Sequence, residues 1–73
     1  MPSKYPVLRP NEIIKVLEKL GFRFVSQKGS HLKYSNGNRV TIIPNHNEVA
    51  KGTLQSILEL AGISIEDFMD ELK

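Results

Sequence analysis

The chain is organised around residues 28–34, which read Lys28-Gly29-Ser30-His31-Leu32-Lys33-Tyr34. Gly29 and Ser30 predict a tight turn, because glycine accepts positive φ angles and serine can hydrogen-bond to its own backbone. His31 then lies at the exposed start of a strand. Histidine can accept or donate a proton near neutral pH, and neighbouring ammonium groups attract a phosphodiester and favour the neutral, proton-accepting ring. A histidine flanked by lysines at such a turn indicates chemistry on RNA.

Three strands are expected around this turn. Aromatic and β-branched residues predict a first strand over Phe22–Gln27, and His31–Ser35 forms the second. The run Asn36-Gly37-Asn38 is a strong hairpin signal, which makes Arg39–Ile43 the third strand. Pro44 is expected to stop the pairing, because proline cannot donate a backbone hydrogen bond.

Side chains alternate between the two faces of a strand, so the sheet is expected to have one apolar face and one basic face. The face toward the helices would carry Leu32, Tyr34, Val40 and Ile42. The open face would carry His31, Lys33, Arg39 and Thr41. The histidine of the turn therefore belongs to the basic face.

Two amphipathic helices are expected to cover the apolar face. The first has Pro10 at its first helical position and ends at Gly21, and the second ends at Gly62. Their apolar residues recur at helical spacing and are Ile13, Ile14, Leu17 and Leu20, then Leu54, Ile57, Leu58 and Ala61. Ser64 and Asp67 resemble a capping box that opens a short last helix. The predicted fold class is α+β, a two-layer sandwich of order α-β-β-β-α with a short extra C-terminal helix.

Length and composition limit the possible classes of protein. The 73 residues are expected to form one domain spanning residues 1–73. The absence of cysteine excludes disulfides, thiol catalysis and thiolate metal sites, and it favours a reducing, cytoplasmic setting. No secretion signal and no apolar run of roughly 20 residues occurs, so we expect a soluble protein that does not bind a membrane.

The charges are distributed unevenly along the chain. Residues 1–52 carry nine lysines or arginines and three acidic residues, whereas residues 53–73 carry one and five. The predicted sheet therefore lies wholly in the basic part. Such asymmetry suits nucleic-acid binding, because neutralised phosphates supply most of the non-specific affinity, although surface charge also serves solubility.

Several short motifs, in their order along the chain, resemble those of the HicA family. They are Leu20-Gly21-Phe22, Gly29-Ser30-His31, Pro44 with His46, Lys51-Gly52-Thr53-Leu54, Ile57-Leu58 and Ala61-Gly62-Ile63-Ser64. The resemblance implies a double-stranded-RNA-binding-domain-like fold. It also implies a toxin that cleaves mRNA and is silenced by a HicB-type antitoxin in a hetero-oligomeric complex. The family's catalytic histidine falls on His31, and Leu32 stands where many relatives carry a second histidine.

The residues around His31 suit a metal-independent endoribonuclease. Such an enzyme needs a base for the ribose 2′-OH, cations for the charge that develops on the phosphate, and an acid for the leaving 5′-oxygen. His31 is the expected base, and the expected RNA-binding residues are Lys28, Ser30, Lys33 and Arg39. The sequence does not identify the acid, and the candidates are Lys33, Tyr34, His46, water and His31 itself. His46 is also a secondary candidate for the site. No cofactor or metal is expected, because the histidines and acidic residues lack the spacing of metal ligands.

Two other functions are open at this stage. A non-catalytic RNA-binding module is the alternative, since the same fold can bind RNA by its shape and backbone without cutting it. In a third interpretation, the sheet face only docks a protein partner. A requirement for the His31 imidazole distinguishes the nuclease from the RNA-binding module. Failure to bind RNA whatever the salt concentration would favour protein docking.

Overall fold

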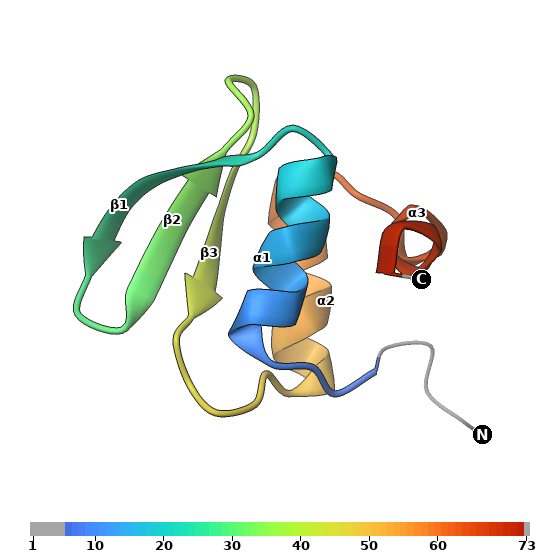
Figure 1. Cartoon of the computed structure of the whole chain (residues 1–73), viewed down its shortest axis with the longest axis horizontal. Coiled ribbons are helices and arrows are strands. Elements are labelled where there is room, and N and C mark those ends of the chain that lie inside the picture. Colours follow the sequence, from blue (N-terminus) through green and yellow to red (C-terminus); the bar gives the residue numbers. More distant parts are fainter. Residues whose placement is uncertain (1–5, 73) are drawn as a thin grey trace.

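The computed structural model describes residues 6–72, in which helices lie on one side of a small sheet (Figure 1). The order and bounds of the elements are α1 (Pro10–Lys19), β1 (Arg23–Lys28), β2 (His31–Ser35), β3 (Val40–Pro44), α2 (Lys51–Ala61) and α3 (Ile65–Leu72). The outermost residues of the unit expected over 1–73 lie outside the described part.

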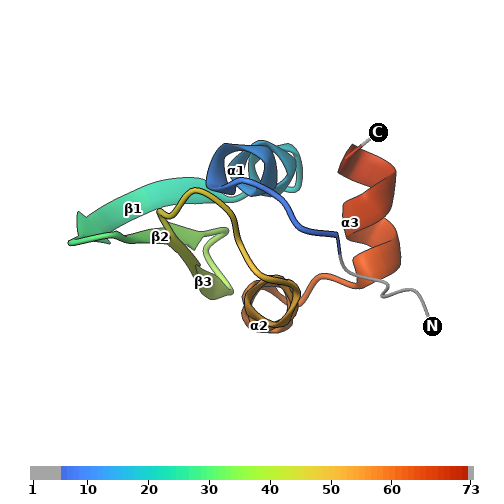
Figure 2. The ribbon, with the colours of Figure 1, turned by 90° about the horizontal axis from the view of Figure 1, so that it is seen from below.

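The strands form an antiparallel sheet in the order β1-β2-β3, and α1 and α2 lie on one of its faces (Figure 2). Both helices pack against β3, and α3 packs against α1 on the side away from the sheet. No described element covers the other sheet face. The arrangement confirms the predicted α+β class and the double-stranded-RNA-binding-domain-like order, with a short helix added at the end.

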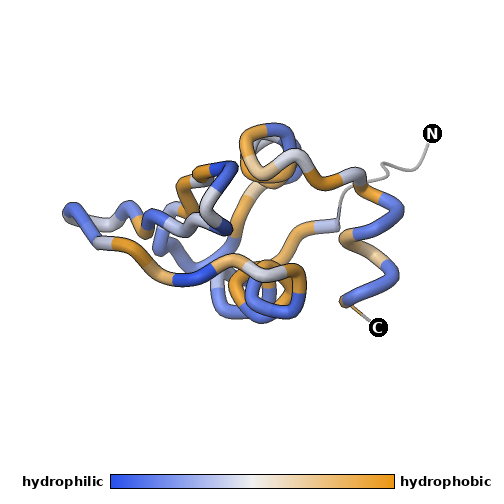
Figure 3. The backbone as a smooth tube through the Cα atoms, turned by 90° about the horizontal axis from the view of Figure 1, so that it is seen from above, coloured by the Kyte–Doolittle hydropathy of each residue, from blue (hydrophilic) through white to orange (hydrophobic). Residues whose placement is uncertain are grey.

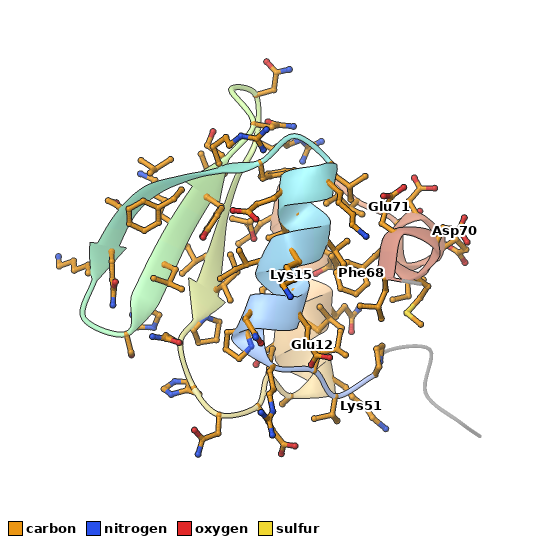
Figure 4. All side chains as sticks on the ribbon, viewed as in Figure 1. Glu12, Lys15, Lys51, Phe68, Asp70 and Glu71 are labelled. Atoms are coloured by element: carbon orange, nitrogen blue, oxygen red, sulfur yellow. The ribbon has the colours of Figure 1, made fainter. Side chains whose placement is uncertain are left out.

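The core lies between the helices and the sheet. Its fully buried large side chains are Ile13, Leu17, Phe22, Ile43, Leu54, Ile57, Leu58 and Phe68. Phe68 lies between α3 and α1, so the last helix contributes to the core (Figure 4). Hydrophobic segments run through both longer helices, whereas the tip where β1 turns into β2 is hydrophilic (Figure 3). The turn that carries His31 therefore projects away from the core.

Local hydrogen bonds fix the ends of α1 as the sequence predicts. The Glu12 carboxylate accepts a hydrogen bond from the Arg9 backbone N–H at 2.8 Å, at the start of the helix. At the other end Gly21 has a φ of +96°, a conformation that costs a residue with a Cβ. The Gly21 N–H donates to the Glu18 backbone carbonyl and the Phe22 N–H donates to the Leu17 backbone carbonyl. The two bonds form a Schellman motif.

The predicted register of β3 is wrong by one residue. Tyr34 pairs with Thr41 and Leu32 pairs with Ile43. Thr41 and Ile43 are both 0% exposed in the core, whereas Val40 is 43% exposed. Because a shift of one residue moves every side chain of a strand to the other face, Val40 and Ile42 belong to the open face and Thr41 does not.

The β2–β3 loop explains the shift. Pairing resumes at Ser35 with Val40, so the loop has one residue more than the Asn36-Gly37-Asn38 run suggests. The Asn36 side-chain oxygen accepts hydrogen bonds from the backbone N–H groups of Asn38 and Arg39, at 2.9 and 2.7 Å, and holds the longer loop. Buried Thr41 is satisfied, because its hydroxyl donates to the Ile57 carbonyl at 2.8 Å.

The ends of two strands also differ from the prediction. β1 covers Arg23–Lys28, one residue later than expected, because Phe22 belongs to the helix cap and is buried. The pairing does not stop before Pro44. Pro44 is itself the last residue of β3 and pairs with His31. Proline is tolerated there because β3 is an edge strand of the sheet.

Candidate nucleic-acid interface

A two-residue turn positions His31. Gly29, with a φ of +59°, and Ser30 connect β1 to β2, and glycine in first place is typical of tight hairpin turns. The Gln27 side-chain amide donates to the Gly29 carbonyl at 2.9 Å and braces the turn. His31 is the first residue of β2 and is exposed, so its ring is accessible to a large substrate.

The structure brings four of the expected site residues together at this turn. Lys28 pairs with His31 across the hairpin, and residues paired in this way have Cβ atoms roughly 4.5–5.5 Å apart. Lys33 follows His31 by two residues on β2, so the two side chains lie on the same face, and Ser30 lies in the turn itself. All four residues are exposed. We call Lys28, Ser30, His31 and Lys33 the basic end of the sheet.

Arg39 does not lie at the basic end, so its expected place beside His31 is wrong. Ser35 lies four residues along β2 from His31, roughly 13 Å at the usual rise of a strand, and Arg39 lies beyond Ser35. The guanidinium of Arg39 packs on the end of α2, where a Cβ added to Gly62 would lie 3.1 Å from its Cζ and Nε atoms. A cation is favourable at the C-terminal end of a helix.

His46, the secondary candidate, does lie near the basic end. It is exposed in the loop between β3 and α2, and this loop, the β1–β2 turn and the start of α1 occupy the same end of the molecule (Figure 1). The Asn45 backbone N–H donates to the Ser30 carbonyl at 2.6 Å, which ties the loop to the turn.

An open cleft of about 600 Å³ adjoins this loop. Its lining residues are Arg9, Pro10, Asn11, Asn45, His46, Asn47 and Glu48. Apart from His46, sequence reasoning did not select these residues, because the two lining segments are far apart in the chain. The only local signal was the polar run that follows Pro44.

Tyr34 lies on the opposite face of the sheet from His31. It is 6% exposed and packs edge-to-face on Phe24, with the ring centroids 5.8 Å apart. Burial raises the pKa of the Tyr34 phenol from its ordinary value of 10.0, and the negative charge of Glu18 raises it further. Tyr34 therefore belongs to the core and does not lie beside His31.

Neither a metal centre nor a membrane segment is found in residues 6–72. No three histidine or acidic side chains of this part are grouped so that they could hold a metal ion. None of its helices has both the length and the apolar character that crossing a membrane requires.

Comparison with known proteins places this geometry in a family. Residues 10–63 match the family model described as HicA toxin of bacterial toxin-antitoxin. The matched part runs from the start of α1 past the end of α2 and includes the sheet and the basic end. No curated relative matches the chain. The match over most of its length shows that the chain belongs to the HicA toxin family of bacterial toxin–antitoxin systems.

Proposed function

We propose that this toxin is an endoribonuclease that cuts mRNA in the cytoplasm, with His31 as the general base. The observation that carries the proposal is the basic end, where an exposed histidine lies between two lysines on the uncovered face of the sheet. Lysines attract the phosphates of RNA, and the histidine supplies a proton acceptor beside them. Membership of the HicA toxin family supports a toxic activity of this kind.

The proposed reaction is an attack by the ribose 2′-oxygen on the adjacent phosphorus. The neutral His31 imidazole takes the 2′-OH proton as the new P–O bond forms and the P–O5′ bond breaks. Lys28 and Lys33 stabilise the negative charge that develops on the phosphate oxygens. The products are a 2′,3′-cyclic phosphate and a 5′-hydroxyl, and no step is assigned to a metal ion.

The leaving 5′-oxygen must gain a proton. Tyr34 is not used, because it lies on the other face of the sheet. Lys33, His46, water and the His31 imidazolium formed in the first step are the available donors. Arg39 would contact the RNA backbone roughly a strand's length from the cut.

A HicB-type antitoxin would silence the toxin by covering the basic end in a hetero-oligomer. The same positive charges that attract RNA would attract an acidic surface of the antitoxin. Hydrogen exchange on the complex tests this directly. Backbone protection at residues 28–33 is expected, whereas protection confined to α3 would contradict occlusion of His31.

Purified wild-type protein and the variant His31→Ala test the proposed activity. The wild type is expected to cut RNA in the presence of EDTA and to leave 2′,3′-cyclic phosphate ends. His31→Ala is expected to bind RNA with similar affinity but to lose cleavage and growth arrest, because the charges of Lys28 and Lys33 remain. RNA binding without cleavage by the wild type would instead identify a non-catalytic RNA-binding module.

A further inference from the structure

The open cleft beside the basic end has no role in the reaction described above, except that it includes one candidate acid, His46. Its volume of about 600 Å³ lies within the range of roughly 300–1,000 Å³ that is common for small-molecule sites. The first turn of α1 forms one side and the loop of residues 45–48 forms the other. The cleft is therefore large enough for one nucleotide unit of an RNA chain.

One wall of the cleft is anchored to the β1–β2 turn, and the other wall is tied to the end of the same loop. The loop begins directly after Pro44, which pairs with His31, and the Asn45 N–H is bonded to the Ser30 carbonyl at 2.6 Å. The loop ends at Val49, whose N–H donates to the Leu8 carbonyl at 2.7 Å, next to the α1 wall. An RNA strand held at His31 would therefore reach the cleft within one or two nucleotides.

The chemistry of the lining suits an RNA base better than a phosphate. Three asparagines each offer a side-chain acceptor and two donors, and the His46 ring offers a flat face for stacking. The Glu48 carboxylate only accepts hydrogen bonds and repels a phosphate, whereas it can take the N–H groups of a base. Arg9 adds a cation that can reach the backbone of the same nucleotide.

We propose that this cleft holds the base of an unpaired RNA nucleotide next to the one cut at His31. The inference rests on the proposed ribonuclease function, which it extends to substrate choice. Guanine is the best fit, because its Watson–Crick edge presents two adjacent N–H donors to the Glu48 carboxylate. Uracil fits worst, because its single donor on that edge lies between two carbonyl oxygens that a carboxylate repels.

Nucleotide binding can be measured without any cleavage. Guanosine 5′-monophosphate is expected to shift the NMR signals of the Asn45 and Asn47 side-chain amides of the wild-type chain. Uridine 5′-monophosphate should shift them less, and inorganic phosphate should leave them unchanged. The proposal is overturned if neither nucleotide moves these signals, if phosphate alone reproduces the shifts, or if the two nucleotides act equally.

Cleavage of RNA with randomised nucleotides around the cut gives the second measurement. Asn47→Ala is expected to raise KM about tenfold, the order of one lost hydrogen bond, with kcat unchanged and a weaker base preference beside the cut. Asn38→Ala is the matched control, because Asn38 is exposed in the hairpin at the other end of the sheet.

The two measurements separate the two proposals. If the wild type cuts RNA but Asn47→Ala behaves like Asn38→Ala, the cleft proposal fails and the ribonuclease stands. If the wild type does not cut RNA but guanosine monophosphate shifts the cleft amides selectively, nucleotide binding stands and the ribonuclease fails.

Discussion

Placing an aspartate at either of two neighbouring residues of β3 tests which side chains form the open face. Thr41 is 0% exposed and faces the core, whereas Val40 is 43% exposed on the face that carries His31. Thr41→Asp would bury an unpaired carboxylate against the Ile57 carbonyl, which Thr41 contacts at 2.8 Å. An uncompensated buried charge costs about 3–5 kcal/mol, a large share of the roughly 4–11 kcal/mol expected for a chain of this size.

Val40→Asp carries the same charge and should cost much less. Full burial of a valine is worth about 1.5–3 kcal/mol, and only part of that is present at a half-exposed site. The poor strand propensity of aspartate adds up to about 1 kcal/mol. We therefore expect a loss of about 1–2 kcal/mol in the free energy of unfolding.

Urea unfolding followed by circular dichroism measures both variants against the wild type. Thr41→Asp should lose at least about 2 kcal/mol more than Val40→Asp, or should fail to fold. Equal losses, or a larger loss for Val40→Asp, would refute the register and with it the composition of the open face.

Three further predictions concern charge, the helix cap and pH. Lys33→Ala should reduce the slope of log affinity for RNA against log salt concentration by about one, whereas Lys15→Ala on α1 should not. Equal slopes for the two variants would show that Lys33 does not contact the RNA. Gly21→Ala should lower the free energy of unfolding by about 1 kcal/mol, because φ at Gly21 is +96°, whereas Gly52→Ala within α2 should not. Equal effects of the two substitutions would contradict the glycine cap of α1. Because the pKa of Tyr34 is raised in the folded state, its protonated phenol favours the fold below about pH 10. This contribution is lost as the pH rises through the pKa of Tyr34 in the folded state. Above pH 10, the free energy of unfolding should therefore depend less on pH in Tyr34→Phe than in the wild type. An unchanged dependence would argue against the raised pKa of Tyr34.

Features set by neighbouring residues could be predicted from the sequence. Gly21 and Gly62 end helices because each takes a left-handed conformation at the end of an apolar stripe. The Ser64 hydroxyl accepts the Asp67 N–H at 3.1 Å, as the capping signal indicates. His31 at the start of β2 follows from the Gly29-Ser30 turn in the same way.

Features that depend on loop length or on distant segments could not be predicted. The phase of β3 depends on one extra loop residue, held by side-chain bonds of Asn36 that the hairpin signal does not specify. Because the extra residue makes Arg39 part of the loop, Arg39 lies at the end of α2 and not beside His31. The cleft joins the start of α1 to residues 45–48, and no local pattern of residues indicates that these segments meet.

The single-turnover cleavage rate of His31→Gln shows whether the His31 imidazole removes the 2′-OH proton. Glutamine keeps a polar side chain at the exposed start of β2 but cannot take a proton at neutral pH. Loss of a positioned general base costs on the order of 10²–10⁴-fold in rate. We predict a loss of this size in a variant whose circular dichroism spectrum and RNA affinity match the wild type. A folded His31→Gln protein that cuts RNA at nearly the wild-type rate would show that His31 is not the general base.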